Sequence, residues 1–183
     1  MLRADEEIRT SRLVLRAPRE VDVLPDVQMI GDTGARGGPG KDGSRIKRWQ
    51  SFLDGIGHWQ MRGLGFLAIT DRADGTIYGR CGLLPHDETG ETQLAYTLFD
   101  GFEGRGIAFE AAVAVRRHAG KERNLPPLVS FVSPGNARSH QLAERLGATR
   151  VGYHEGAGDT LVFYRHVAWS TPLAQAQWHE VTL

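Results

Sequence analysis

A glycine-rich turn between a strand and a helix is the feature of this sequence that most restricts its fold. The segment GFEGRGIAFEAA, residues 101–112, follows the strand-like run TQLAYTLF at 92–99. It opens a stretch, from Ile107 to Ala119, in which apolar residues recur every fourth position, as in a helix. Glycines at such a turn let successive backbone N–H groups face one point, toward which the positive end of the helix dipole is also directed. The turn therefore predicts a site for an anion such as a phosphate group.

Two widespread phosphate-binding patterns do not fit this turn. A P-loop requires Lys followed by Ser or Thr after its second glycine, and Ile107 and Ala108 stand there instead. A dinucleotide-binding fingerprint requires Gly or Ala where Phe109 stands, and it opens a parallel β-α-β unit near the start of a domain. Taken alone, the turn is also compatible with a loop that holds no ligand.

Composition narrows the class of protein. The chain has 183 residues, of which 40% are hydrophobic, and this suits one domain with one core. Its 22 basic residues balance 22 acidic ones, so charge favours neither nucleic acid nor an anionic membrane as a partner. The charged start and the lack of a run of about 18 apolar residues predict a cytoplasmic protein without a membrane span.

The single cysteine, Cys81, cannot form an internal disulfide. This agrees with a reducing compartment and excludes a thiolate zinc cluster, and no metal is expected. We interpret Cys81 as a buried strand residue and not as a catalytic thiol, because no neighbouring His or Lys marks a lowered pKa.

The residues before the turn predict a strand, a helix and three consecutive antiparallel strands. The alternation over 12–16 indicates a strand that Pro18 ends. An amphipathic helix is expected from Ser44, with Gly55 and Gly57 as its stop. The three antiparallel strands are expected at 66–70, 77–83 and 92–99, the first two joined by a hairpin around Asp74 and Gly75.

The residues after the turn predict a strand, a second helix and a closing strand pair. Asn136 is expected to begin the helix and Gly147 to end it, because glycine suits the left-handed position after a helix. The strands are expected at 128–132, 149–153 and 160–166. The tail over 168–183 is weakly patterned, and Trp169 and Trp178 are expected to pack either on the domain or on a second subunit of a homodimer.

A segment near the start, GDTGARGGPGKDG at 31–43, carries glycine at every third position. Collagen is excluded, because so few triplets cannot hold three chains together and globular patterning surrounds them. We expect a flexible loop, and loops of this length often serve as lids or binding loops.

The order of the motifs resembles a known family. The strand, the Gly-x-Gly-x-Ala turn and the helix are followed by PGNARSHQLAERLGA at 134–148, and this combination closely resembles the GNAT acyl-CoA N-acyltransferase superfamily. Three further segments resemble its ribosomal-protein N-acetyltransferase-like branch: TSRLVLRAP at 10–18, GHWQMRGLGFLAI at 57–69 and YGRCGL at 78–83. The resemblance covers about 8–167 as a single domain and leaves 168–183 as a tail.

The resemblance implies an α/β (α+β) fold in which a mixed, mostly antiparallel sheet is flanked by helices, and two central strands splay apart to admit acyl-CoA. It implies an enzyme that moves an acetyl group from acetyl-CoA to a primary amine, on a small molecule or a protein N-terminus, by direct attack on the thioester. A second reading is an acyl-CoA-binding sensor or interaction module that has lost transfer.

The resemblance also assigns roles to residues by position. The backbone over 96–98 would pair with the pantetheine arm, and the N–H of Leu98 would polarise the thioester carbonyl. Asn136 would bind the cofactor further along, or serve mainly as a helix N-cap. Ser139 would lie near the thioester sulfur. The expected cofactor-binding residues are Tyr96, Thr97, Leu98, Gly104, Arg105, Gly106, Ile107, Ala108 and Asn136.

Three positions depart from the family pattern. Glu103 stands where relatives often have Gln or Arg, and because its charge would repel phosphate it is expected to point outward. Ala143 stands where many relatives have a Tyr that acts as an acid, which leaves Ser139 as the candidate acid. Gln93 stands where relatives commonly have a Glu base, and an amide cannot accept the proton of the amine.

The candidate bases lie in the loop before Gln93. They are His86, Asp87, Glu88 and Glu91, and each can also be a solvated loop residue. His58 is expected to make a structural hydrogen bond at the end of the first helix, whereas His118 and His140 are expected on the surface.

Overall fold

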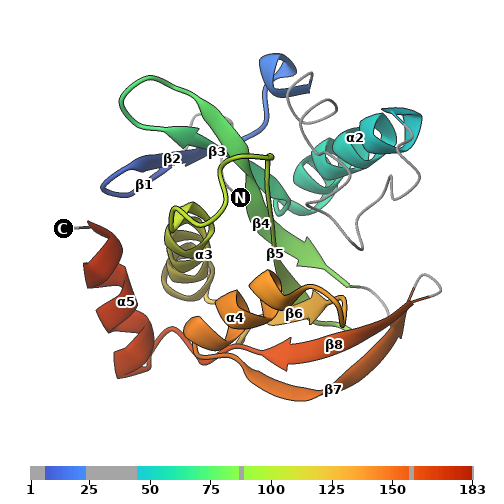
Figure 1. Ribbon diagram of the computed structural model, residues 1–183, viewed down its shortest axis with the longest axis vertical. Coiled ribbons are helices and arrows are strands. Elements are labelled where there is room, and N and C mark those ends of the chain that lie inside the picture. The colour runs from blue at the N-terminus through green and yellow to red at the C-terminus, as the bar shows by residue number, and fades with distance from the viewer. Residues whose placement is uncertain (1–6, 24–44, 87–88, 157–158, 183) are drawn as a thin grey trace.

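A computed structural model of the chain describes residues 7–23, 45–86, 89–156 and 159–182. Its strands form one eight-stranded sheet in the order β1-β2-β3-β4-β5-β6-β8-β7 (Figure 1). Every neighbouring pair is antiparallel except β5 and β6, which are parallel. The expected mixed, mostly antiparallel sheet flanked by helices is confirmed. The segment at 31–43 and the candidate bases Asp87 and Glu88 lie outside the described residues.

From β2 to β8 the elements follow the predicted sequence of strand, helix, meander, helix, strand, helix and strand pair, and β1 and α5 were not predicted. In chain order the elements are β1 (Glu7–Arg9), β2 (Leu13–Arg16), the 3-10 turn η1 (Glu20–Asp22), α2 (Arg45–Arg62), β3 (Phe66–Asp71), β4 (Ile77–Pro85), β5 (Thr92–Leu98), α3 (Ile107–Arg117), the π-helical turn η2 (His118–Glu122), β6 (Val129–Val132), α4 (Ala137–Arg145), β7 (Thr149–Gly156), β8 (Asp159–Arg165) and α5 (Pro172–Thr182).

Helix α2 is longer than predicted. Gly55 and Gly57 do not stop it, and it continues to Arg62, after which Gly63 takes a left-handed φ of 64°. A helical glycine costs only about 1 kcal/mol relative to alanine. Packing outweighs that cost, because Phe52 is buried and the Trp59 indole donates to the carbonyl of Phe66 in β3 at 2.6 Å.

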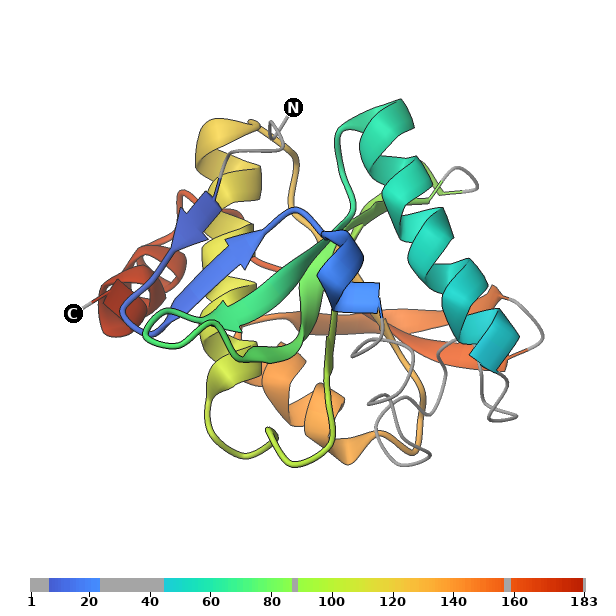
Figure 2. The same cartoon turned by 90° about the horizontal axis from the view of Figure 1, so that it is seen from above.

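Helix α3 forms the centre of the core. All of its residues from Ala111 to Ala114 are completely buried, and they pack with Leu67, Ile69 and Leu94 from the sheet. Helix α2 covers the other face of the sheet, where Phe52 packs with Val23, and the two views show the sheet between α2 and α3 (Figures 1 and 2). The expected burial of Cys81 is confirmed, and burial raises the pKa of its thiol.

The chain over 172–182 forms the helix α5, for which the sequence gave no prediction. Helix α5 packs against α3, and its Val181 belongs to the main core. Trp178 packs on the same core. Trp169 packs so closely on Gly120 that a Cβ added to this glycine would lie only 2.3 Å from the Trp169 Cβ. Both tryptophans therefore pack on their own domain.

Of the two histidines expected on the surface, only His118 is buried. His118 is buried, with its Nδ1 2.8 Å from the Glu122 carboxylate, because α3 continues into the π-helical turn and carries that ring inward. His140 is half-buried, and its Nδ1 lies 2.9 Å from the hydroxyl of Tyr164 in β8. The surface prediction was wrong for His118, because Glu122 in the next turn holds its ring.

Candidate functional site

The two parallel strands β5 and β6 separate almost at once. Their ladder has a single pair, Gln93 with Val129, although β5 continues to Leu98. Strand β6 instead pairs along its whole length with β8. Beyond Leu94, the edge of β5 that faces β6 is therefore open, as the splayed strand pair of the prediction requires.

Alternation in the β4–β5 ladder decides which backbone groups face this opening. Phe99 donates its N–H to the carbonyl of Tyr78, which lies opposite it, at 2.9 Å. In an antiparallel ladder every second residue makes such bonds, and the residues between direct their N–H and C=O groups to the other side. Tyr96 and Leu98 are such intervening residues. Their backbone groups consequently point into the opening, where they can pair with an extended ligand.

The glycine turn lies at the end of the same strand. Gly104 and Gly106 have φ values of 73° and 76°, in the left-handed region that glycine adopts most readily. Gly106 is the N-cap of α3 and makes no side-chain cap bond, while its carbonyl accepts the N–H of Glu110. The first N–H groups of α3 are thus available to an anion, with the helix dipole behind them.

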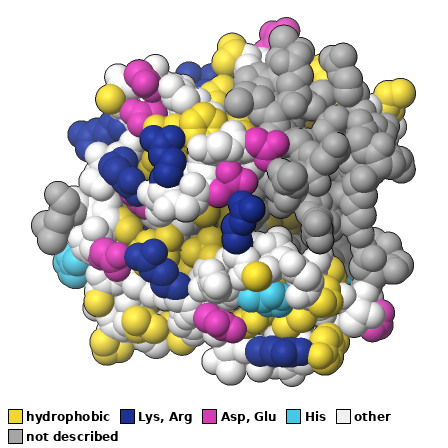
Figure 3. Space-filling view, viewed as in Figure 1, with side chains coloured by type: hydrophobic (Ala, Val, Ile, Leu, Met, Phe, Trp, Pro, Cys, Tyr) yellow, Lys and Arg dark blue, Asp and Glu magenta, His cyan; other side chains and the backbone are white. Residues whose placement is uncertain are grey.

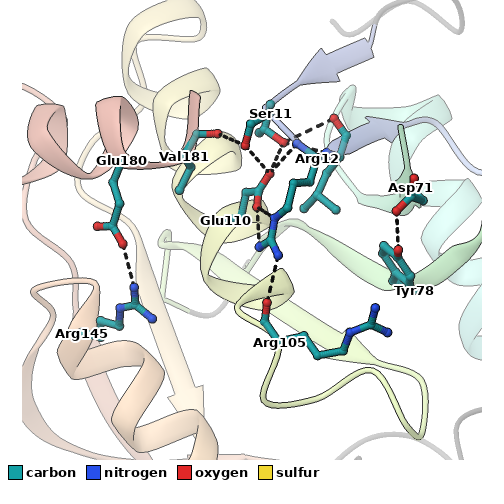
Figure 4. A network of polar contacts seen from close by, with 11 residues as sticks. Ser11, Arg12, Asp71, Tyr78, Arg105, Glu110, Arg145, Glu180 and Val181 are labelled. Carbon is teal, nitrogen blue, oxygen red and sulfur yellow. Dashed lines mark hydrogen bonds and ion pairs between the residues drawn. The ribbon is translucent and has the colours of Figure 1, made fainter. Parts of the chain in front are cut away.

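A buried carboxylate braces this turn from behind. Glu110, in the first turn of α3, accepts hydrogen bonds from the Thr10 hydroxyl at 2.5 Å and from the Arg12 backbone N–H at 3.1 Å. The Arg12 guanidinium pairs with the same carboxylate at 2.7 Å and donates to the carbonyl of Arg105 at 3.1 Å (Figure 4). Arg12 thereby joins the loop between β1 and β2 to the turn.

Sequence reasoning missed Glu110 and Arg12. The two residues are 98 positions apart in the chain, so no local sequence pattern links them. The one available signal was Glu110 itself, the charged residue within the otherwise apolar run 107–115 that opens α3. Charged side chains are almost never fully buried unless they are paired.

The start of α4 forms the opposite wall of the site. Asn136 caps this helix by accepting the N–H of Ser139 at 3.1 Å, as predicted. Ser139 is half-buried in the first helical turn, and its carbonyl accepts the phenol of Tyr96 at 3.3 Å. That bond brings the first turn of α4 against β5. The catalytic role of Ser139 stays a prediction.

Glu103 does not point outward as expected. Its carboxylate folds back over its own turn, where it accepts the N–H of Gly101 at 2.9 Å and pairs with the Arg138 guanidinium at 3.0 Å. The prediction was wrong because it counted only repulsion by a future ligand. Without a ligand, the N–H groups and cations of an anion site attract a carboxylate.

The candidate bases within the described residues both have partners. The Nε2 of His86 lies 2.6 Å from Oε1 of Gln93, and the His86 ring contacts Phe131 edge-on. Glu91 forms a two-pronged pair with Arg165, with distances of 2.7 and 3.2 Å. His86 and Gln93 are therefore brought together at the point where β5 and β6 meet, whereas the Glu91 carboxylate is held by Arg165 at the end of β8.

Two further residues were missed where the strands diverge. The Ser130 hydroxyl donates to the carbonyl of Leu94 at 2.8 Å and lies 2.9 Å from Nε2 of His166. Burial, with a contribution from Arg116, lowers the pKa of His166 to about 3, so the ring is neutral. His166 and Arg116 also line a cavity of about 210 Å³ at the C-terminal end of α3, away from the turn.

The residues fit a long, phosphorylated thioester. The open edge of β5 offers backbone donors and acceptors to an extended amide chain, and the glycine turn offers N–H groups to a phosphate. Among the described residues on the face that carries α3 and α4, acidic and basic side chains are interspersed without a large patch of one sign (Figure 3). In the described part of the chain, no helix has the length and apolar character needed to cross a membrane.

Comparisons with known proteins agree with this geometry. The family model of the acetyltransferase (GNAT) domain matches residues 12–149. An acetyltransferase from Agrobacterium tumefaciens str. C58, known by its crystal structure, is 32% identical, with a TM-score of 0.75 over 91% of this chain and 97% of that one. RimL, a ribosomal L7/L12 alpha-N-protein acetyltransferase solved with coenzyme A, is 19% identical and has a TM-score of 0.72 over 91% of this chain and 100% of its own. That second likeness is one of fold.

Among curated proteins, the uncharacterized YkkB of Bacillus subtilis (strain 168) is 26% identical over 114 residues. These residues cover 58% of this chain and 62% of YkkB, so the chain spans less than two thirds of that relative.

Proposed function

The chain belongs to the GNAT acetyltransferase family, and we propose that it is an acetyl-CoA-dependent N-acetyltransferase acting on a primary amine. The acceptor is a small molecule or a protein N-terminus. The observation that carries the proposal is the open edge of β5 beside the glycine turn. An extended pantetheine arm requires the open strand edge, and a diphosphate requires the glycine turn. This chain has both on adjoining segments.

Acetyl-CoA supplies an activated thioester, so no covalent enzyme intermediate is required.

The N–H of Leu98 donates to the thioester carbonyl oxygen, on which negative charge develops. Alignment of the amine with that carbonyl can supply roughly 7–11 kcal/mol of the barrier reduction. The backbone of Tyr96 holds the arm, whereas the backbone groups of Thr97 face β4 and do not hold it as expected. The turn from Gly104 to Ala108 holds the diphosphate.

Proton transfer falls to residues on either side of the thioester. Gln93 accepts the Nε2–H of His86 through Oε1, which leaves Nδ1 of His86 as the basic nitrogen for the amine proton. Glu91 is the second candidate base, held by Arg165. The Ser139 hydroxyl donates to the departing sulfur at the start of α4, where the positive end of the dipole stabilises the thiolate.

Ligand-dependent melting tests the proposal. Acetyl-CoA at 100 times its Kd should stabilise the folded chain by roughly 2.7 kcal/mol, whereas NAD and ATP should stabilise it much less. A melting series in which NAD raises the midpoint and acetyl-CoA does not would remove the cofactor assignment.

Replacement of Ser139 tests the mechanism separately from binding. Ser139→Ala should lower kcat by about 10²-fold while leaving acetyl-CoA affinity nearly unchanged, because the donated bond strengthens only as charge develops on sulfur. Ser170→Ala is the matched control, because Ser170 lines the cavity at the C-terminal end of α3, away from the turn. An unchanged kcat in Ser139→Ala leaves water as the proton donor.

A second candidate function is an acyl-CoA-binding module without transferase activity. Gln93 and Ala143 favour it, because relatives commonly have a base and an acid at these positions. Release of free CoA thiol across a library of small amines and peptide N-termini separates the two functions. Tight acetyl-CoA binding without release for any acceptor would favour the module.

A further inference from the structure

Glu103 places a negative charge beside the predicted phosphate site, directly before Gly104. Its carboxylate accepts the N–H of Gly101 at 2.9 Å. Its own backbone N–H, together with that of Gly101 and the Arg138 guanidinium, lowers the pKa of this carboxyl below its usual value. Glu103 is therefore an anion that the turn already binds.

The partner of Glu103 comes from the opposite wall of the site. Arg138 lies in the first turn of α4, two residues after the cap Asn136, and its guanidinium reaches the Glu103 carboxylate at 3.0 Å. The side chains of Glu103 and Arg138 are 27% and 71% exposed. Exposed pairs of this kind contribute little to folding stability, so this contact is easily exchanged for another.

A phosphate group competes for the same partners. Guanidinium binds phosphate through parallel charge-assisted hydrogen bonds, and N–H groups at a helix start bind it as they bind a carboxylate. A phosphate that enters the turn must also overcome repulsion by the Glu103 charge. The ligand and Glu103 therefore compete for one cation, Arg138.

Resting on the proposed function, we propose that Glu103 is an internal competitor of the cofactor phosphates. In the free enzyme it lies beside the anion site and holds Arg138. When coenzyme A binds, Arg138 passes from Glu103 to a phosphate of the cofactor. Glu103 thereby weakens cofactor binding and sets the affinity of this chain for phosphorylated acyl carriers.

The proposal requires opposite effects from the two partners. Glu103→Gln keeps the shape of the side chain but removes its charge and releases Arg138, so it should tighten coenzyme A binding about tenfold. Arg138→Gln removes the cation, so it should weaken binding about tenfold. A merely structural salt bridge predicts equal weakening by both variants, because either one breaks the pair.

Calorimetric titration of the full chain with coenzyme A, dephospho-coenzyme A and pantetheine measures these effects. Pantetheine carries no phosphate, so neither variant should change its affinity. If dephospho-coenzyme A loses the Arg138→Gln effect, the 3′-phosphate is the acceptor of Arg138; if it keeps the effect, the diphosphate is. Glu180→Gln is the matched control. It breaks an exposed ion pair, in which Glu180 and Arg145 are 2.8 Å apart and which lies away from the turn (Figure 4), so it should change none of these affinities.

Carbon-13 NMR of the Glu103 carboxyl in the unmodified chain gives an independent measurement. Coenzyme A should raise the pKa of that carboxyl, because it loses Arg138 and gains a neighbouring phosphate. An unchanged pKa, or a Glu103→Gln variant that binds coenzyme A no more tightly, overturns the inference while leaving the proposed function intact. If the unmodified chain does not bind coenzyme A, the proposed function fails first.

Discussion

The two ends of helix α3 are built in opposite ways. At its start, the glycine turn is exposed and presents backbone N–H groups, and Gly106 makes no side-chain cap bond. At its end, Arg116 and His166 are buried, 4% and 3% exposed, and the Arg116 guanidinium donates to the carbonyl of Leu146 and to Gln177.

The helix dipole explains the difference. Its positive end attracts an anion from solution, and its negative end favours a cation from the protein. The start of α3 thus keeps its favourable charge for a ligand, whereas the end uses a buried side chain. Substitutions at the start should therefore change binding, and substitutions at the end should change stability.

The largest expected effect is at the start. Gly106→Val should weaken acetyl-CoA binding by more than about 10²-fold, because a branched residue resists the left-handed φ of 76° and intrudes where phosphate approaches backbone. Gly75→Val is the matched control, with a φ of 78° and open space around it in the β3–β4 hairpin. Both variants should lose similar stability by calorimetry, but only Gly106→Val should lose binding. Equal binding by both variants would remove the turn from the site.

The next effect belongs to the other end. The pKa of His166 is lowered to about 3 when the chain is folded, against an ordinary value of about 6.5. Below pH 6.5 the unfolded chain takes up a proton that the folded chain refuses, so stability should fall as pH falls from 6.5 toward 3, by up to about 1.4 kcal/mol per unit.

Denaturant unfolding between pH 7 and 4.5 measures this slope. His166→Phe should remove one proton from the linkage and leave acetyl-CoA affinity at pH 7 unchanged. A His166→Phe variant that keeps the full slope would show that other groups cause it.

Glu110 is an exception to the contrast between an exposed start and a buried end of α3, because it is buried although it lies at the start. Glu110→Gln should cost roughly 1–3 kcal/mol of stability, since it weakens a charged hydrogen-bond network, and should also weaken acetyl-CoA binding because Arg12 no longer fixes the Arg105 carbonyl. Arg9→Gln, which breaks an exposed pair with Glu7 at 2.6 Å, is the control. If Glu110→Gln bound acetyl-CoA as tightly as the parent, the Glu110–Arg12 contact would contribute to stability alone.

The sequence was sufficient to predict features that depend on short spacings. The meander strands, the glycine turn and the Asn136 cap each follow from residues within a few positions of one another, and the structure confirms them. Helix α5 was missed because its buried face consists of Ala174, Gln177 and Val181, of which only the last is a strong apolar signal.

Features that depend on distant pairs could not be predicted. The turn itself was predicted, but the contact of Glu110 with Arg12 joins residues that are 98 positions apart in the chain. The direction of Glu103 depends on Arg138, which lies 35 residues away. In both cases the local residues fix the shape of the backbone, and a remote cation decides where the carboxylate points.

The smallest expected effect sharpens the comparison at α4, whose start uses a side-chain cap where α3 uses bare glycine. Asn136→Ala should lower the free energy of unfolding by roughly 0.5–2 kcal/mol, because the N–H of Ser139 loses its acceptor. Asn136→Ser keeps an oxygen that can cap the helix but removes the amide. If Asn136 also binds the cofactor, Asn136→Ser should regain most of the stability, by denaturant unfolding, while its acetyl-CoA affinity stays as low as that of Asn136→Ala. If both variants bind acetyl-CoA like the parent, Asn136 serves as a cap alone, and the start of α4 then resembles the buried end of α3 more than its open start.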